Sequence, residues 1–177
     1  MKKVFLAAFV VVMVVFSAAA QKKSHGFTAG YQTLKFKSSE DDVSISVEGS
    51  GYALGIFTDI PIAEKFSVQP ELQYASTSED GESINQIIVP VMFKYWPSER
   101  VNIQAGPQID FGLSDWPSNF KDVGLGFALG LGVDVSDYVF LAVRYSLGLF
   151  DRGDDAIDLS GVDLKTNQFH IGMGYRF

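Results

Sequence analysis

The sequence predicts an all-β fold, an eight-stranded antiparallel up-and-down transmembrane β-barrel, from three observations. After Gly26, bulky apolar residues alternate with small or polar ones with a period of two, as side chains do along a strand. The connections between the alternating segments are short and long by turns, which is the pattern of such a barrel. The chain ends in a strand-like segment, Asn167–Phe177, whose bulky side carries Phe169, Ile171, Met173, Tyr175 and Phe177.

Composition limits the functional classes. The 177 residues suit one domain, and 17 glycines, 15 phenylalanines and 7 tyrosines suit a barrel with aromatic residues outside and small residues at crowded positions. Because the chain has no cysteine, it has no disulfide, thiolate metal site or lipidated cysteine. A net charge of −7 without a basic cluster argues against binding to nucleic acid.

Residues 1–20 have the features of a secretory signal peptide. Lys2 and Lys3 form a positive start, Val4–Phe16 is apolar, and Ala18–Ala20 is a small-residue cleavage site. The alternative, a transmembrane helix, needs about 20 apolar residues, which is more than this segment contains. We therefore expect removal of the signal peptide after Ala20, which leaves an outer-membrane β-barrel domain of residues 21–177.

The eight expected strands share the alternation and lie at 26–33, 52–60, 66–74, 87–95, 101–111, 123–135, 139–149 and 167–177. Short turns are expected at one end of the barrel, at 61–65, 97–100 and 136–138, and long polar loops at the other, at 38–42, 76–83, 113–122 and 150–166. Within the second loop, Asp80-Gly81 is a strong signal for a two-residue hairpin, because both positions tolerate positive φ. Alternation also continues in 43–48 and 157–164, which allows the first and last hairpins to project beyond the membrane.

The apolar side of each strand is expected to face lipid. A soluble sandwich or a lipocalin-like barrel would need a charged, water-facing second side. Here that side is mostly Gly, Ala, Ser, Gln and Asn, which suit the crowded interior of a narrow barrel. Aromatic residues also gather toward the rims, as in the girdles of membrane barrels: Phe27, Phe66, Tyr95, Tyr175 and Phe177 near the short turns, and Tyr52, Tyr74, Phe111 and Phe169 toward the other rim.

Five segments carry a family resemblance: Gln69–Leu72, Ile88–Tyr95, Gln104–Pro107, Arg144–Leu149 and Gly172–Phe177. They resemble the porin-family outer-membrane β-barrel domain of the Bacteroidetes type, which is similar in architecture to small OmpX/OmpA-type barrels. The resemblance covers the chain from about Gly26 to Phe177. It implies a multi-pass barrel in the bacterial outer membrane, and it carries over no catalytic residue. Together with the up-and-down topology, it leads us to expect both termini in the periplasm.

The interior is expected to be filled, because an eight-stranded barrel is only about wide enough to hold its own side chains. Large groups on the interior side are Phe57, Met92, Lys94, Trp96, Phe140 and Arg144. Because buried charges persist only when paired, we expect a lumen charge network of Glu71, Lys94, Asp110 and Arg144. Glu71 and Arg144 fall on strands that are not neighbours. Their contact is therefore expected to cross the lumen, directly or through Gln69, Gln73, Gln104 and Gln108.

The loops favour a structural or surface-interaction role, because their acidic residues would form an outer rim: Glu40, Asp41, Asp42, Glu48, Glu79, Asp80, Glu82, Asp115, Asp122, Asp151, Asp154, Asp155, Asp158 and Asp163. The first alternative is a narrow passive pore for small solutes. A lipid-modifying enzyme comes third, because neither His25 nor His170 belongs to a recognisable His/Ser/acid pattern.

The expected partners follow from this reading. Outer-membrane lipids would surround the barrel, and the barrel-assembly machinery would bind the C-terminal strand. Exposed strand edges could recruit an extracellular protein by strand addition. No catalytic residue, cofactor, metal site or nucleic-acid partner is predicted.

Overall fold

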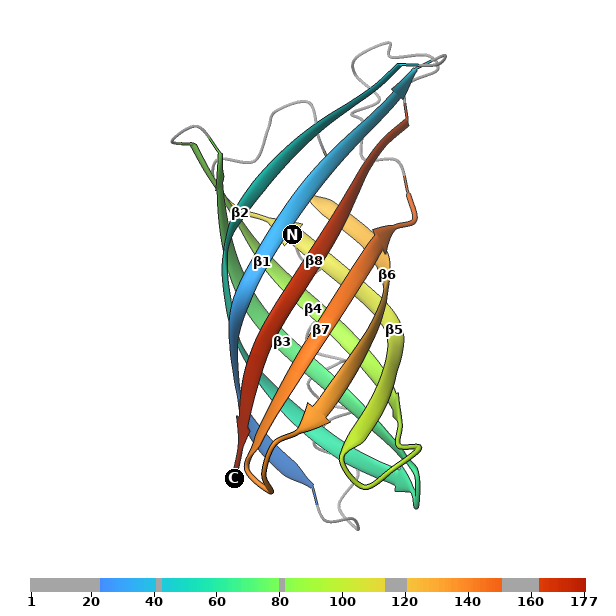
Figure 1. The fold of residues 1–177 in the computed structure, drawn as a ribbon. Helices are drawn as coiled ribbons and strands as arrows, with labels where there is room; N and C mark the ends of the chain where they lie inside the picture. Colours follow the sequence, from blue (N-terminus) through green and yellow to red (C-terminus); the bar gives the residue numbers. More distant parts are fainter. Residues whose placement is uncertain (1–22, 41–42, 80–81, 114–120, 151–162) are drawn as a thin grey trace, which may run out of the picture.

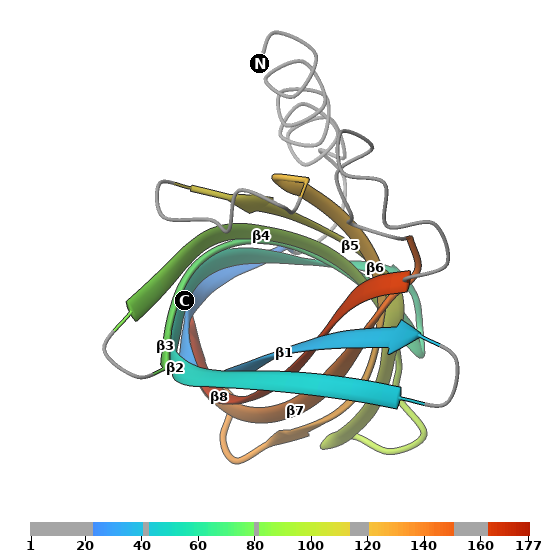
Figure 2. The same ribbon diagram turned by 90° about the horizontal axis from the view of Figure 1, so that it is seen from above.

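The strands of the computed structural model run up and down in sequence order and close into a barrel, with β8 beside β1 (Figure 1). The structure describes residues 23–40, 43–79, 82–113, 121–150 and 163–177, so the predicted signal peptide lies outside the described residues. The strands are β1 (Ser24–Glu40), β2 (Val43–Ala63), β3 (Phe66–Glu79), β4 (Glu82–Tyr95), β5 (Val101–Gly112), β6 (Val123–Asp134), β7 (Val139–Gly148) and β8 (Asp163–Arg176). Viewed along the axis, they form a closed ring (Figure 2).

All neighbouring strands pair antiparallel, including the closing pair of β1 and β8. The predicted eight-stranded up-and-down barrel is therefore confirmed. Within the residues that are described, no helix is long and apolar enough to span a bilayer.

The two predicted faces are clearest on β6. Its exposed side carries Leu125, Phe127, Leu129 and Leu131, whereas Gly124, Gly126 and Ala128 on the other side are buried. The bulky apolar side chains therefore point away from the barrel, and the small ones point inward. This arrangement leaves room inside for long side chains from the facing strands, and it places the apolar surface where lipid would contact it.

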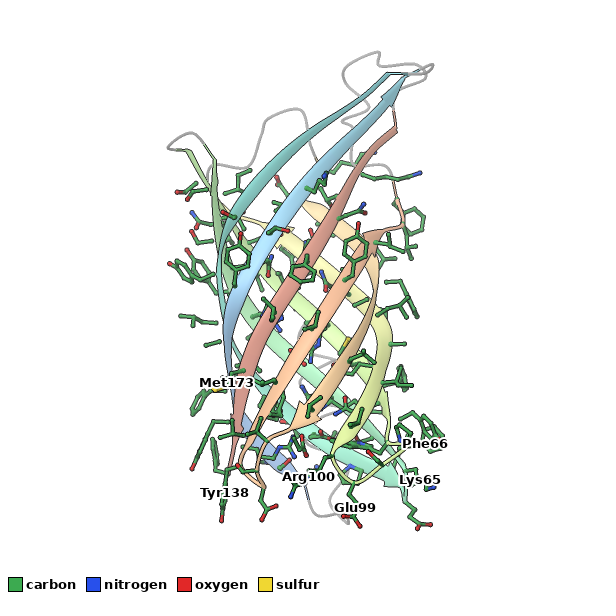
Figure 3. The ribbon with its side chains drawn as sticks, in the orientation of Figure 1. Lys65, Phe66, Glu99, Arg100, Tyr138 and Met173 are labelled. Carbon is green, nitrogen blue, oxygen red and sulfur yellow. The ribbon has the colours of Figure 1, made fainter. Side chains whose placement is uncertain are left out.

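The start of β1 and the end of β8 meet at the rim that carries the short turns. Phe177 N donates to the His25 carbonyl oxygen at 2.8 Å, and the register of β1 against β8 runs from Gly26↔Arg176 to Ser39↔Asp163. Aromatic rings pair around the same rim, with centroids 5.6 Å apart for Phe27 and Phe177, 5.1 Å for Phe66 and Tyr95, and 6.2 Å for Tyr138 and Tyr175. Figure 3 shows Phe66 and Tyr138 at this end, beside the turn residues Lys65, Glu99 and Arg100.

Two predicted loops are largely strand. β1 and β2 stay paired up to Glu40↔Val43, and β3 and β4 up to Glu79↔Glu82, so each connection shortens to two residues. These connections, 41–42 and 80–81, lie outside the described residues. The alternation in 43–48 had allowed the first hairpin to extend in this way. For β3 and β4 the prediction ended the strands where apolar alternation ended, but outside a bilayer a ladder can be polar on both faces. The Ser78 and Ser83 hydroxyls, 2.8 Å apart, are such a polar cross-strand pair.

The first short turn also differs from the prediction. β2 continues through Pro61 to Ala63, so that only Glu64 and Lys65 form the turn. Thr58 and Ile60, which alternation placed on the lipid side, are buried.

The alternation fails beside Pro70. The register of β2 against β3 has no paired partners at Thr58 and Asp59, at the level of Pro70. Proline has no N–H to donate to a ladder, so the strand geometry is irregular at this level.

The assignment of faces predicts a large difference between adjacent residues of β6. Leu129→Arg is expected to destabilise the barrel folded in a bilayer by about 2–4 kcal/mol, because residue 129 lies on the lipid side. Ala128→Ser, on the lumen side, should cost much less. Denaturant titration of both variants in lipid vesicles measures the difference, and equal stability of Leu129→Arg and the parent would contradict the assignment.

Candidate functional site: the lumen network

The polar interior is centred on an ion pair between Glu71 of β3 and Arg144 of β7. Arg144 Nη2 lies 2.6 Å from Glu71 Oε1, and Nη1 donates to Oε2 at 2.8 Å, so the contact is bidentate. β3 and β7 are not neighbours in the barrel, and the two side chains therefore meet across the lumen. Both are buried. Two charges at this depth are stable only with each other and with further hydrogen bonds.

Neighbouring amides supply those hydrogen bonds. Gln69 Nε2 donates to Glu71 Oε1 at 2.6 Å, and Gln73 Nε2 donates to Oε2 at 2.5 Å. Because residues 69, 71 and 73 are two apart on β3, one strand face presents all three side chains to the lumen. Arg144 Nε donates to Gln104 Oε1 of β5 at 2.8 Å. Each carboxylate oxygen of Glu71 thus accepts from both the guanidinium and an amide.

Gly130 of β6 provides the space for Arg144, its partner in the β6–β7 register. A Cβ at residue 130 would lie 2.7 Å from Arg144 Cγ and 2.5 Å from the Val143 carbonyl oxygen. A glycine is therefore needed at residue 130, where a larger residue would displace the arginine.

A second ion pair lies nearer the short turns. Lys94 Nζ of β4 contacts Asp59 Oδ2 of β2 at 2.9 Å, and Lys94 is 1% exposed. The same ammonium group also donates to Gln69 Oε1, while Gln69 Nε2 donates to Glu71. Gln69 therefore joins the two ion pairs. We call the connected set the lumen network: Asp59, Gln69, Glu71, Gln73, Lys94, Gln104 and Arg144.

The predicted charge network and the structure can be compared residue by residue. Glu71, Lys94 and Arg144 belong to the lumen network. Asp110 is buried on β5, opposite Gly124 at the start of β6 and thus toward the end with the long loops. Sequence reasoning missed Asp59 as the partner of Lys94. Its place on the inner side of β2 was a signal, but the pairing depends on how the strands are staggered.

Aromatic rings pack against the second ion pair. Phe57 and Phe140 pack edge to face with centroids 5.4 Å apart. Lys94 Nζ lies 5.2 Å and Arg176 Cζ 4.9 Å from the Phe140 centroid, both within cation–π range. Arg176 in turn pairs with both Asp134 oxygens, at 2.7 and 2.8 Å.

The barrel contains more free space at its short-turn end than beside the Glu71–Arg144 pair. At the short-turn end a vestibule of about 620 Å³ is lined by residues that include Asp59, Ser67, Trp96, Asp134 and Arg176. Beside the Glu71–Arg144 pair, a second cavity of about 20 Å³ remains. At the level of the central ion pair, the cavity is large enough for about one water molecule.

The two histidines do not form one site. His25 lies within β1 rather than before it, and its Nδ1 is 2.9 Å from Thr58 Oγ1. His170 of β8 pairs in register with Gln32, seven residues further along β1, or about 23 Å at the rise of a strand. Among the residues described, no three His, Cys, Asp or Glu side chains are grouped as metal ligands would be.

The C-terminal strand presents its predicted residues outward. Ile171, Met173, Tyr175 and Phe177 are exposed, and Phe169 is partly covered. The predicted acidic rim lies mostly outside the described side chains. Of its members, Asp122 is described as exposed, and Glu40, Glu48, Glu79, Glu82 and Asp163 are described only as strand residues.

Comparisons with known proteins agree with this architecture. The family model of the outer membrane protein beta-barrel domain matches residues 6–177. The crystal structure of Ail, the attachment invasion locus protein of Yersinia pestis, is 15% identical, with 88% of this chain and 99% of that chain covered and a TM-score of 0.53. Ail in complex with the heparin analogue sucrose octasulfate is 18% identical, with the same coverage and a TM-score of 0.51.

Neisserial surface protein A is 14% identical, with 85% of this chain and 97% of that chain covered and a TM-score of 0.54. No curated protein sequence gives a significant match. At these identities the solved structures support the fold alone.

The central ion pair predicts a large effect of removing one partner. Arg144→Ala is expected to lower the free energy of unfolding by about 3–5 kcal/mol, because the Glu71 carboxylate would remain buried without its cation. The double variant Glu71→Gln/Arg144→Met leaves no unpaired charge and should lose much less. Urea unfolding in lipid vesicles measures both. The pairing argument fails if the double variant is no more stable than Arg144→Ala.

Proposed function

This chain belongs to the outer membrane protein beta-barrel domain family, and on that premise we propose that it is a side-chain-filled barrel with a surface-interaction role. It is thus an integral protein of the bacterial outer membrane. That it is of the Bacteroidetes type stays a prediction. The proposed role rests on one observation, a sheet that continues beyond the rest of the barrel.

Three strands build this projecting sheet, which comprises residues 36–40 of β1, 43–49 of β2 and 163–167 of β8 (Figure 1). β1 is paired on both sides, up to Glu40↔Val43 with β2 and Ser39↔Asp163 with β8. By contrast, the register of β2 against β3 begins only at Ser50↔Ser78. In the part of the chain that is described, residues 43–49 of β2 therefore pair with β1 alone. An open edge of this kind is a template for an added strand.

Charge suggests the kind of partner. Along the chain, acidic residues of the long loops come directly before or after the strands of the projecting sheet. Such residues would repel a sulfated ligand and attract a basic one. In this respect the chain is expected to differ from Ail, whose structure contains a heparin analogue. We propose a basic, extended protein segment as the partner. The outward aromatic strand β8 remains the proposed contact for the barrel-assembly machinery.

The proposed orientation places the long loops outside the cell. Short turns face the periplasm in barrels of this class, and both ends of the described chain lie at the short-turn rim. Protease added to intact cells should therefore cut near Asp41, Asp80, Asn119 or Asp155 and spare Lys65 and Arg100. Cleavage at either of these two turn residues in intact cells would contradict the proposed orientation and favour the opposite one.

A narrow passive pore is the alternative, and the vestibule is the observation that favours it. Solvent can enter the barrel from the short-turn end as far as Asp59. Against a pore, the lumen network fills the next level, where about 20 Å³ remains. Steady single-channel conductance of the parent protein in planar bilayers would favour the pore over our proposal. An enzyme is not proposed, because the two histidines belong to separate levels of the barrel.

Shortening the projecting sheet tests the proposed role. Replacing residues 36–47 by Asn-Gly preserves the pair Lys35↔Glu48 and removes the open edge. The probe is a peptide of alternating lysine and valine, titrated against the protein in zwitterionic nanodiscs. We expect the parent to bind it in a salt-dependent manner, and the shortened variant to bind about tenfold more weakly, equivalent to about 1.4 kcal/mol.

The matched control shortens the other long hairpin. Replacing residues 77–84 by Asn-Gly preserves Ser76↔Asn85 and leaves the projecting sheet intact, so peptide binding should persist. Equal peptide binding by the parent and the 36–47 variant would rule out the open edge of β2 as the binding site. Preferential binding of sucrose octasulfate would rule out a basic partner.

A further inference from the structure

The 20 Å³ cavity beside the central ion pair is surrounded by polar side chains from several strands. Gln32, Arg144, Ser146, Gln168 and His170 are among its lining residues. Three of them form a cross-strand row, because Gln32 of β1 pairs in register with His170 of β8, which pairs with Arg144 of β7. These strands are side by side in the barrel (Figure 1). The cavity thus lies where β1 and β8, which close the barrel, meet the lumen network.

Two polar atoms of the lining have no protein partner. Gln32 Nε2 and His170 Nδ1 are both buried and make no hydrogen bond, and Gln32 as a whole is only 1% exposed. A buried amide N–H without an acceptor is costly. Other polar groups around the cavity are engaged elsewhere: Gln73 with Glu71, Gln108 with Gln168, and Arg144 with Glu71 and Gln104.

The His170 ring is held in place by glycines. A Cβ at residue 30 would lie 2.7 Å from His170 Nε2, and a Cβ at residue 172 would lie 2.8 Å from its Cε1. The imidazole therefore packs on the backbone of β1 and β8 at residues 30 and 172, where no residue larger than glycine fits. Rotation of the ring toward another partner is restricted by this contact.

We infer that one water molecule is bound in this cavity, accepting a hydrogen bond from Gln32 Nε2 and bonding to His170 Nδ1. The volume suits a single water, which needs a polar site of at least about 10–15 Å³ and two or more polar partners. A larger solute does not fit. A halide ion would also accept from Gln32, but the Glu71–Arg144 pair is already balanced, so an extra buried charge would have no counter-charge.

The bound water has a structural consequence. The lumen network takes its side chains from β2, β3, β4, β5 and β7. The water adds a link between β1 and β8, because Gln32 and His170 belong to these two strands. The strands that close the barrel are then joined through their side chains as well as by the backbone ladder.

A crystal structure at high resolution, grown with bromide in place of chloride, tests the inference directly. The expected result is one density peak about 3 Å from both Gln32 Nε2 and His170 Nδ1, without anomalous signal. An anomalous bromide peak would show that a halide ion, and not water, occupies the cavity, and it would overturn the inference. An empty cavity, with the Gln32 amide turned to a protein acceptor, would overturn the inference.

The sign of a stability change gives a second test. If Gln32 Nε2 has no partner, Gln32→Leu removes an unsatisfied donor and should raise the melting temperature. If the amide binds water, the same change removes a satisfied hydrogen bond, and we expect the melting temperature to fall. A rise would contradict the inference.

A double-variant cycle then tests whether Gln32 and His170 share the water. Gln32→Leu, His170→Phe and their combination are compared with the parent by thermal melting in lipid vesicles. Sharing predicts that the combination loses less than the sum of the single changes, because either change releases the same water. Strictly additive losses would contradict a shared ligand.

Discussion

Arg144 and Glu71 reach each other across the lumen from strands that are not neighbours, and much of the interior is arranged around their contact. Neither charge could remain at this depth alone, because an unpaired ion in the interior costs several kcal/mol. Their presence requires amides at 69, 73 and 104 to complete the hydrogen bonding. It also requires a glycine at 130, since any side chain there would displace the arginine.

The two ends of the barrel differ because different interactions dominate there. At the short-turn rim, outward aromatic pairs and the inward Arg176–Asp134 contact lie close to the meeting of β1 and β8. At the other rim, β1, β2 and β8 continue into the projecting sheet. The short-turn end is thus held by side-chain contacts, and the projecting end carries the backbone groups that we propose for a partner.

Membership of the family accounts for the barrel and its membrane, but the function must be argued from features of the structure itself. Two such features are the filled lumen and the projecting sheet. The filled lumen is the reason that we propose a surface role rather than a pore. Among the described residues, 43–49 of β2 pair with β1 alone, and we assign the proposed partner to this open edge.

The sequence by itself predicted the number of strands, the lipid and lumen faces apart from Thr58 and Ile60, and an interaction of Glu71 with Arg144, either direct or through glutamines. Period-two alternation is local, and the rule that buried charges pair leaves few partners in so short a list of interior charges. Only the tertiary structure decided which residues share a level of the lumen. The level of a residue depends on the stagger of neighbouring strands, and an alternation with a period of two residues does not reveal this stagger. The stagger brings Asp59 to Lys94, makes Gln69 the joint of the two ion pairs, and places Gln32 beside His170. The alternation in 43–48 indicated that the first hairpin could project, whereas the extension of β3 and β4 to Glu79 and Glu82 has no apolar pattern and appears only in the structure.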